Sequence, residues 1–288
     1  MKKFILILVT IALIILAFLL VKSCYESGNK KSKVFGDNIS NTPKNDKDIQ
    51  AYNLSVKRSQ SASALPCDTL DVVEYVLKNY AAGSYLLNFD KTLTYNVPKP
   101  AVIYYHENEK QYIFGIVARS KPGERLIEPK NIVGYDQSFI DLDSTELGTA
   151  FFYLTLFECN NNKLFVVWEA PVPSHGGLNR MFLEKWNFRG IPYIKIDFHY
   201  ARGTGHIDYN YFFLHGITQE PHLLMTYKGI NFKRTLANIN NDNFPDYYEF
   251  VYYDTGRRIF VADSIGFTWN NNDSLYVSSR NRNMTRPY

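Results

Sequence analysis

After residue 100 the chain is divided into short runs of Val, Ile, Phe and Tyr, separated by segments rich in Asn, Asp and Gly. Runs that recur about every 8–12 residues with turn residues between them are typical of antiparallel β-sheets. Aromatic residues make up 16% of the chain, which suits sheets that pack on both faces. The pattern therefore predicts a mainly β fold, either a sandwich or an irregular meander, in one domain over residues 67–288.

One helix is expected at the start of this domain, in the segment CDTLDVVEYVLKNY at 67–80. Asp68 can cap the first turn, and Asp71 lies near the positive end of the helix dipole. The apolar side chains recur at helical spacing and predict one buried face. The residues of this face are Leu70, Val73, Val76, Leu77 and Tyr80.

The N-terminus begins with a short basic stretch, and Phe4 to Val21 is then an uncharged, largely apolar run of eighteen residues. A run of this length is an export signal or a membrane anchor. In both cases the basic end stays in the cytoplasm, and the rest of the chain lies on the other side of the membrane. Residues 1–23 are therefore expected to attach the protein to a membrane.

The run ends in VKSC, residues 21–24, which resembles the lipid-attachment motif of bacterial lipoproteins. The resemblance implies cleavage before Cys24, lipidation of its thiol, and a place in the bacterial cell envelope. Lys22 departs from the small uncharged residue usual at its position. An uncleaved anchor is the alternative.

Residues 24–66 are polar and rich in Asn, Ser and Lys, without a run that buries enough apolar area to offset ordering entropy. We expect this segment to be a flexible tether. A coil of 42 residues, Tyr25 to Pro66, has a root-mean-square span of roughly 35–40 Å. The folded domain can then stand clear of the membrane.

Charge and cysteine content limit the possible partners. The chain has 32 Lys and Arg against 28 Asp and Glu, and residues 1–23 hold three of the lysines and no acid, so 29 basic residues face 28 acidic ones after cleavage. Nucleic acid is therefore not expected as a partner. Besides Cys24 only Cys67 and Cys159 remain. They can form one disulfide or stay as two buried thiols.

The segment NINNDNFPDYYE, residues 238–249, carries side-chain oxygens at alternating positions between two strand-like runs. It resembles the calcium loops of EF-hands and dockerins, and most closely those of FG-GAP β-propeller repeats, because Pro245 occupies the eighth position. Asn243 stands where these loops have a glycine, and Asn tolerates the left-handed conformation best among other residues. The alternative is an Asn-rich turn that binds no ion.

Carried over by position, the resemblance implies a structural Ca²⁺ with few carboxylate ligands. Such a site is weak and suits extracellular calcium concentrations. The implied ligands are the side chains of Asn238, Asn240, Asp242 and Asp246, the carbonyl of Phe244, and optionally Glu249.

A second candidate site lies in DFHYARGTGHID, residues 197–208. A hairpin in which paired residue numbers sum to 405 places Ile194, Ile196 and Phe198 on one apolar face. The other face then opposes Asp197 to Asp208 and His199 to His206, and facing carboxylates repel. Lys195 or Arg202 can compensate, or Zn²⁺ or Mn²⁺ can be bound.

Two function classes follow. One is a non-enzymatic envelope lipoprotein whose domain binds a protein or glycan partner and carries the calcium. The other is a metal-dependent envelope hydrolase that uses the hairpin residues, with Glu220 as the base. The sequence contains no nucleotide-binding loop and no zinc-protease motif.

Overall fold

The computed structural model describes residues 51–58, 65–89, 94–95, 99–121, 132–135, 138–141, 147–173, 178–200 and 205–288. They belong to a compact unit, Pro43–Tyr288. The expected signal or anchor, Cys24 and the tether up to residue 50 lie outside the described residues. Within the described part, no helix is long and apolar enough to cross a membrane.

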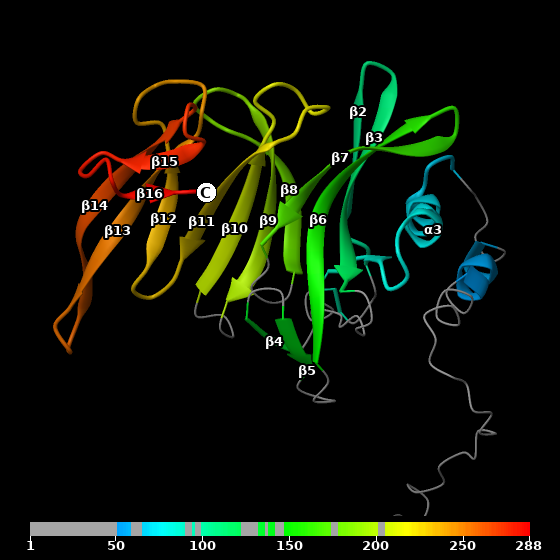
Figure 1. Ribbon diagram of the computed structural model, residues 1–288, viewed down its shortest axis with the longest axis horizontal. Coiled ribbons are helices and arrows are strands. Elements are labelled where there is room, and N and C mark those ends of the chain that lie inside the picture. Colours follow the sequence, from blue (N-terminus) through cyan, green and yellow to red (C-terminus); the bar gives the residue numbers. More distant parts are fainter. Residues whose placement is uncertain are drawn as a thin grey trace, which may run out of the picture. The chain divides into compact units, whose positions relative to one another are not determined.

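The predicted mainly β fold is confirmed: the described residues form two antiparallel sheets, with seven and nine strands (Figure 1). The strands of the first sheet are β1 Tyr85–Leu86, β2 Val102–Glu107, β3 Lys110–Ser120, β4 Ile132–Tyr135, β5 Ser138–Asp141, β6 Leu147–Asn160 and β7 Lys163–Val172. Those of the second are β8 Leu178–Lys185, β9 Pro192–Tyr200, β10 Gly205–Phe212, β11 His222–Lys228, β12 Lys233–Ala237, β13 Asp246–Asp254, β14 Ile259–Asn270, β15 Leu275–Ser278 and β16 Thr285–Arg286.

Strand order differs between the two sheets. In the second sheet each strand pairs with the next along the chain, from β8 to β16, so this half is a plain meander. In the first sheet β3 and β6 are the central pair, and β6 also pairs with β5 and β7. Antiparallel strands that follow each other along the chain, as in the second sheet, need only short turns between them. This agrees with the Asn-rich and Gly-rich segments between the apolar runs.

A common core joins the two sheets. The ring of Phe114 on β3 stacks on Phe213, which follows β10, with centroids 5.4 Å apart. The indole of Trp168 on β7 donates to the carbonyl of Ile217 at 2.7 Å, and the hydroxyl of Tyr211 on β10 donates to the carbonyl of Pro171 at 2.7 Å. Burial of these apolar rings with their polar atoms satisfied gives the sandwich its cohesion.

The predicted register of the β9–β10 hairpin is confirmed. Ile194 lies opposite Tyr211, Ile196 opposite Tyr209, and Asp197 opposite Asp208. Ile194, Ile196 and Tyr209 are fully buried in the common core. Register follows from the apolar pattern here because a slip by one residue would turn the whole buried row toward the other face.

The opposite face of the second sheet carries its own aromatic cluster. Tyr193 stacks on Phe212 at 4.7 Å, and Tyr247 stacks on Phe267 at 4.8 Å. Tyr276 on β15 completes this cluster, and its side chain is buried. Both faces of the sheet are therefore packed, as the aromatic content indicates.

The predicted helix is α3, Thr69–Asn79. Asp68 caps it, as expected, and Asp71 also forms a reciprocal capping box with Asp68. Val76 of the predicted face is buried, and Val73 and Tyr80 pack partly buried against the same core. Val72, which the spacing does not place on this face, is fully buried as well. Leu77 lines a depression together with residues of a second element, the helical segment 51–58.

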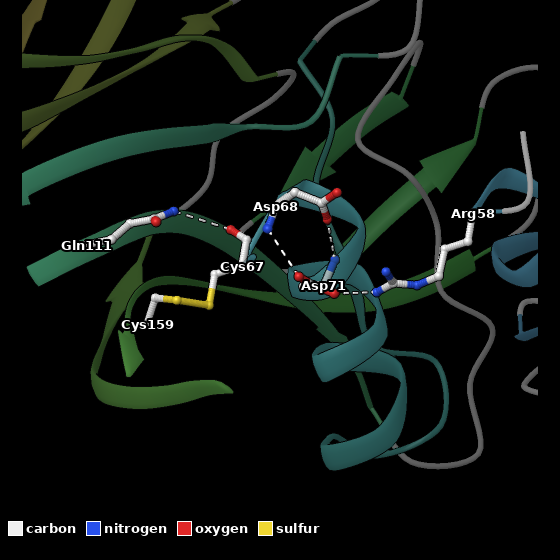
Figure 2. The surroundings of a disulfide bond; sticks show 6 residues. All are labelled: Arg58, Cys67, Asp68, Asp71, Gln111 and Cys159. Carbon is white, nitrogen blue, oxygen red and sulfur yellow. Dashed lines mark hydrogen bonds and ion pairs between the residues drawn. A yellow bond between two sulfur atoms is a disulfide. The ribbon is translucent and has the colours of Figure 1, made fainter. Parts of the chain in front are cut away.

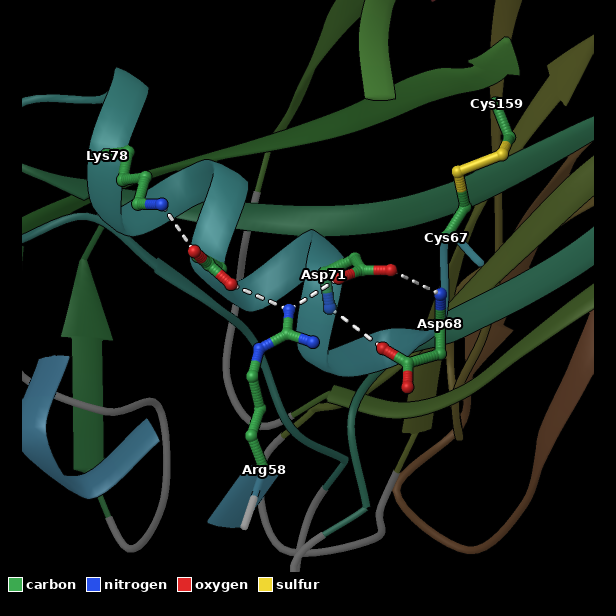
Figure 3. A network of polar contacts seen from close by, with 7 residues as sticks. Arg58, Cys67, Asp68, Asp71, Lys78 and Cys159 are labelled. Carbon is green, nitrogen blue, oxygen red and sulfur yellow. Dashed lines mark hydrogen bonds and ion pairs between the residues drawn. A yellow bond between two sulfur atoms is a disulfide. The ribbon is translucent and has the colours of Figure 1, made fainter. Parts of the chain in front are cut away.

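This segment corrects the predicted tether, because residues 51–58 are helical and contact the domain. Leu54 is buried, and Arg58 forms ion pairs with Asp71 and, at 2.7 Å, with Glu74 (Figure 3). The composition of residues 51–58 indicates a coil, but Leu54 and Arg58 hold the segment against α3. The domain begins before residue 67.

The two late cysteines form a disulfide, which settles the alternative left open above. Cys67, directly before the cap of α3, is bonded to Cys159 at the end of β6, with Cα atoms 6.0 Å apart (Figure 2). The side chain of Gln111 on β3 donates to the carbonyl of Cys67 at 3.4 Å. The bond holds the start of the helix against the first sheet.

Removal of the disulfide tests its contribution to stability. It closes a loop across 92 residues, and the chain-entropy model assigns about 4–5 kcal/mol to a loop of this size. We expect the Cys67→Ser, Cys159→Ser variant to lose roughly 2–5 kcal/mol in urea unfolding. Reduction of the wild-type protein should give the same loss, and a midpoint unchanged by either treatment would contradict this role.

Candidate functional site

The segment predicted to bind calcium is a curled loop between β12 and β13. Ala237 pairs with Asp246 at its base, so residues 238–245 form the connection of a hairpin. The left-handed residue is Asn241, with φ of 60°, and not Asn243, where the resemblance places it. The expected curvature is present, but the turn comes two residues earlier.

Asp246 is the centre of the loop. Its side chain is fully buried, and its carboxylate accepts backbone N–H groups from Ile239 at 2.7 Å, Asn240 at 3.3 Å and Trp269 at 3.3 Å. Burial raises the pKa of this carboxyl group, while the three N–H donors act in the opposite direction. Asp246 thus joins both ends of the loop to the adjacent strand β14.

The exposed part of the loop is closed by short side-chain hydrogen bonds. Asp242 accepts the N–H of Phe244 at 2.7 Å, and Asn240 accepts the N–H of Asp242 at 3.1 Å. The amide of Asn238 donates to Asn241 at 3.3 Å, while its own Oδ1 is buried and has no hydrogen-bond partner among the described residues. The contacts of Asp242 and Asn240 with backbone N–H groups are of the Asx-turn type, which holds a loop without an ion.

The donor set fits a weak calcium site only in part. Asn238 has an acceptor oxygen without a hydrogen-bond partner among the described residues. In the same loop the amide of Asn240 donates to the carboxylate of Asp242 at 2.7 Å. The carboxylate of Asp246 already serves three N–H groups. Glu249, the optional ligand, is already paired with another group. It lies on β13, and its carboxylate is 2.9 Å from the guanidinium of buried Arg234.

An arginine from another turn supplies positive charge at the rim of the loop. The guanidinium of Arg189, in the turn between β8 and β9, donates to the backbone carbonyl and, at 3.1 Å, to the side-chain oxygen of Asn241. This contact was not predicted, because 52 residues separate the partners. It joins the β8–β9 turn to the loop through Asn241.

An aromatic cluster packs against the loop residues Phe244 and Pro245. The hydroxyl of Tyr276 donates to the carbonyl of Pro245 at 2.9 Å, and Nε2 of His222 lies 2.7 Å from the same hydroxyl. Since the hydroxyl proton goes to Pro245, Nε2 of His222 is the donor in the second contact. Burial among Phe244 and Trp269 lowers the pKa of His222 to about 4. His222 is uninformative in the sequence, because only the fold brings it here.

The second candidate site, the end of the β9–β10 hairpin, contains its own counter-charge. The ammonium group of Lys195 lies 3.0 Å from the buried carboxylate of Asp208, and Nε2 of His206 lies 3.8 Å from the same carboxylate. Burial is the main cause that raises the pKa of Asp208, and Lys195 opposes it. Asp197 accepts the amide of buried Asn179 at 3.3 Å. Lys195 therefore compensates the charge of Asp208, which is one of the alternatives that the sequence allows.

This arrangement is less suited to a transition metal than the sequence suggests. The side chain of His199 and the whole of Arg202 lie outside the described residues. Among the side chains that are described, no three His, Cys, Asp or Glu are grouped to hold a metal ion. An ammonium group beside Asp208 also repels a dication.

The role suggested for Glu220 is wrong. This residue lies in the turn that joins β10 to β11, two residues before His222, which pairs with Phe212. The hairpin carboxylates lie at the other end of β10, and Phe212 is four positions along the strand from Asp208, or roughly 13 Å. Glu220 cannot act as a base on a ligand of that hairpin.

A polar cluster that sequence analysis missed lies between α3 and the first sheet. The guanidinium of Arg119 is ion-paired with Glu169 and packs against the rings of Tyr80 and Tyr153, 4.7 and 4.3 Å from their centroids. An open depression of about 430 Å³ adjoins it. The charges of Arg119 and Glu169 neutralise each other within this cluster.

Comparison of the chain with models of protein families, with curated proteins and with solved structures found no match.

The role of Asp246 can be separated from that of calcium by unfolding in the presence of a chelator. In the Asp246→Asn variant an NH₂ group faces a backbone N–H, so we expect a loss of about 1–3 kcal/mol without any calcium. The matched control, Asp242→Asn, changes a half-buried carboxylate of the same loop, and the Asn side-chain oxygen can still accept the N–H of Phe244, so this variant should stay within about 0.5 kcal/mol of wild type. A loss in Asp246→Asn that appears only with calcium would contradict closure by hydrogen bonds.

The lowered pKa of His222 predicts sensitivity to acid. In the unfolded chain this histidine binds a proton below its pKa of about 6.5, whereas in the folded protein it binds one only near pH 4. Protonation therefore favours the unfolded chain between these values, and stability is lost as pH falls through this window. Compared with His222→Gln, the wild type should lose roughly 1–3 kcal/mol between pH 6.5 and 4. Parallel stability curves for the two proteins would exclude this effect.

Proposed function

We propose that the protein is a membrane-tethered, non-enzymatic envelope lipoprotein whose β domain acts as a binding or structural module outside the cytoplasm. The observation that carries the proposal is the disulfide between Cys67 and Cys159. Bonds of this kind persist in oxidising compartments and are rare in the cytosol. Together with the apolar run before Cys24, it supports export followed by attachment to a membrane.

Calcium enters the proposal as a weak addition to a loop that already closes by itself. Asn238, Asn240, Asp242 and the Phe244 carbonyl are the groups that would hold the ion. With one carboxylate among them, they would bind in the range of about 10⁻⁴–10⁻³ M typical of extracellular modules. The ion would add stiffness to the loop and take part in no reaction.

The hydrolase alternative has less support. Its metal would have to displace Lys195 from Asp208, and its base is not Glu220. Elemental analysis of the purified protein distinguishes the two functions. Stoichiometric zinc or manganese that disappears in a His199→Ala, His206→Ala variant would support the hydrolase, and calcium alone would support the lipoprotein.

Anchoring is tested by expression of the full chain in a bacterium, followed by fractionation and intact mass measurement. We expect the protein in the membrane fraction, with a mature N-terminus at Cys24 that carries lipid, and with Cys67 and Cys159 oxidised. A Cys24→Ala variant should lose the lipid mass. Recovery of the wild type in the cytosol with both late cysteines reduced would overturn the proposal.

A further inference from the structure

The β13–β14 hairpin extends past its neighbours in the sheet. Strand β12 pairs with β13 only as far as Phe250, and β15 pairs with β14 only from Phe267. From residue 251 to residue 265, the described residues include no third strand that pairs with β13 or β14. This part of the hairpin, with its turn, is therefore a two-stranded ribbon. Figure 1 shows this orange hairpin reaching beyond β12.

The ribbon exposes apolar side chains on both faces. Tyr253 and Phe260 are paired on one face, with ring centroids 5.6 Å apart. Ile259 and Val261 alternate with Phe260 and so lie on the other face. All four are between 40 and 58% exposed, although such side chains are normally covered.

The turn of the ribbon carries positive charge. Arg257 and Arg258 are both exposed. Asp254 lies in the same turn and accepts the N–H of Gly256 at 2.7 Å, so this turn carries two positive charges and one negative charge. Asp263, farther along β14, is ion-paired with Arg280 at 2.6 Å. The end of the hairpin therefore combines two arginines with aromatic and aliphatic side chains.

We propose that this ribbon binds the surface of an anionic lipid bilayer, an inference that rests on the membrane tether of the proposed function. A flat protein partner would cover one face of the ribbon and leave the other in water. The interfacial layer of a bilayer surrounds an inserted hairpin on every side and covers both. Arg257 and Arg258 complement anionic headgroups, and aromatic residues favour this layer.

The backbone limits the depth of insertion. Outer-edge N–H and C=O groups of the ribbon have no strand partner, and such groups cannot enter the hydrocarbon core. The ribbon therefore lies at headgroup level, with its apolar side chains directed toward the acyl chains. The domain is held to the membrane at two places, its N-terminus and this hairpin.

The test is hydrogen exchange of the full chain in nanodiscs that hold one copy each. Discs of phosphatidylcholine alone are compared with discs that also contain phosphatidylglycerol. Amides of residues 251–263 should exchange about tenfold more slowly in the anionic discs. An Arg257→Gln, Arg258→Gln variant should lose this difference.

A matched pair of variants separates the ribbon from general hydrophobicity. Tyr253→Ser with Phe260→Ser should abolish the protection. Tyr95→Ser with Phe165→Ser removes one exposed Tyr and one exposed Phe elsewhere and should keep it. All the replaced aromatic side chains are exposed, so the fold should survive in both variants.

The outcomes distinguish this inference from the proposed function. Equal exchange in both lipids, or protection that appears only when several copies share a disc, overturns the bilayer as the partner. If the chain does not enter discs, the tether has failed, and the soluble chain is then floated with phosphatidylglycerol vesicles. Flotation that depends on Tyr253 and Phe260 still supports the ribbon, and its absence refutes it.

Discussion

The C-terminal half of the domain depends on one buried carboxylate. Asp246 begins β13 and accepts N–H groups from the loop before it and from Trp269 on β14. A buried charge is tolerated only when hydrogen bonds replace its hydration. These three bonds fix how β12 enters β13 and how β14 lies beside it, and the long β13–β14 hairpin projects from that fixed base.

Other charges of the domain are also compensated inside the protein. Lys195 neutralises Asp208, and Arg234 pairs with Glu249 while its guanidinium stacks on Tyr247 at 4.1 Å. Groups that are paired in this way contribute to the uniqueness of the fold and have little capacity left for a ligand. The β13–β14 ribbon differs from these groups, because it exposes several apolar side chains together beside Arg257 and Arg258.

The features that sequence predicts well are those set by local spacing. The β9–β10 register follows from the alternation of Ile194, Ile196 and Phe198, and the cap of α3 follows from Asp68 and Asp71 three residues apart. The features that it misses depend on residues far apart in the chain. Arg189 reaches Asn241 and Glu249 turns to Arg234 only because the sheet brings them together. The resemblance to a calcium loop rests on local spacing alone. Spacing does not show that the carboxylate of Asp246 accepts three backbone N–H groups.

The most direct test of this account is amide exchange, measured by NMR, at Ile239, Asn240 and Trp269 in protein freed of divalent ions. If the carboxylate of Asp246 closes the loop, these three amides are protected without calcium, and added calcium changes them little. Rapid exchange of the three in the absence of ions, with protection restored by calcium, would show that the ion and not the carboxylate holds the loop.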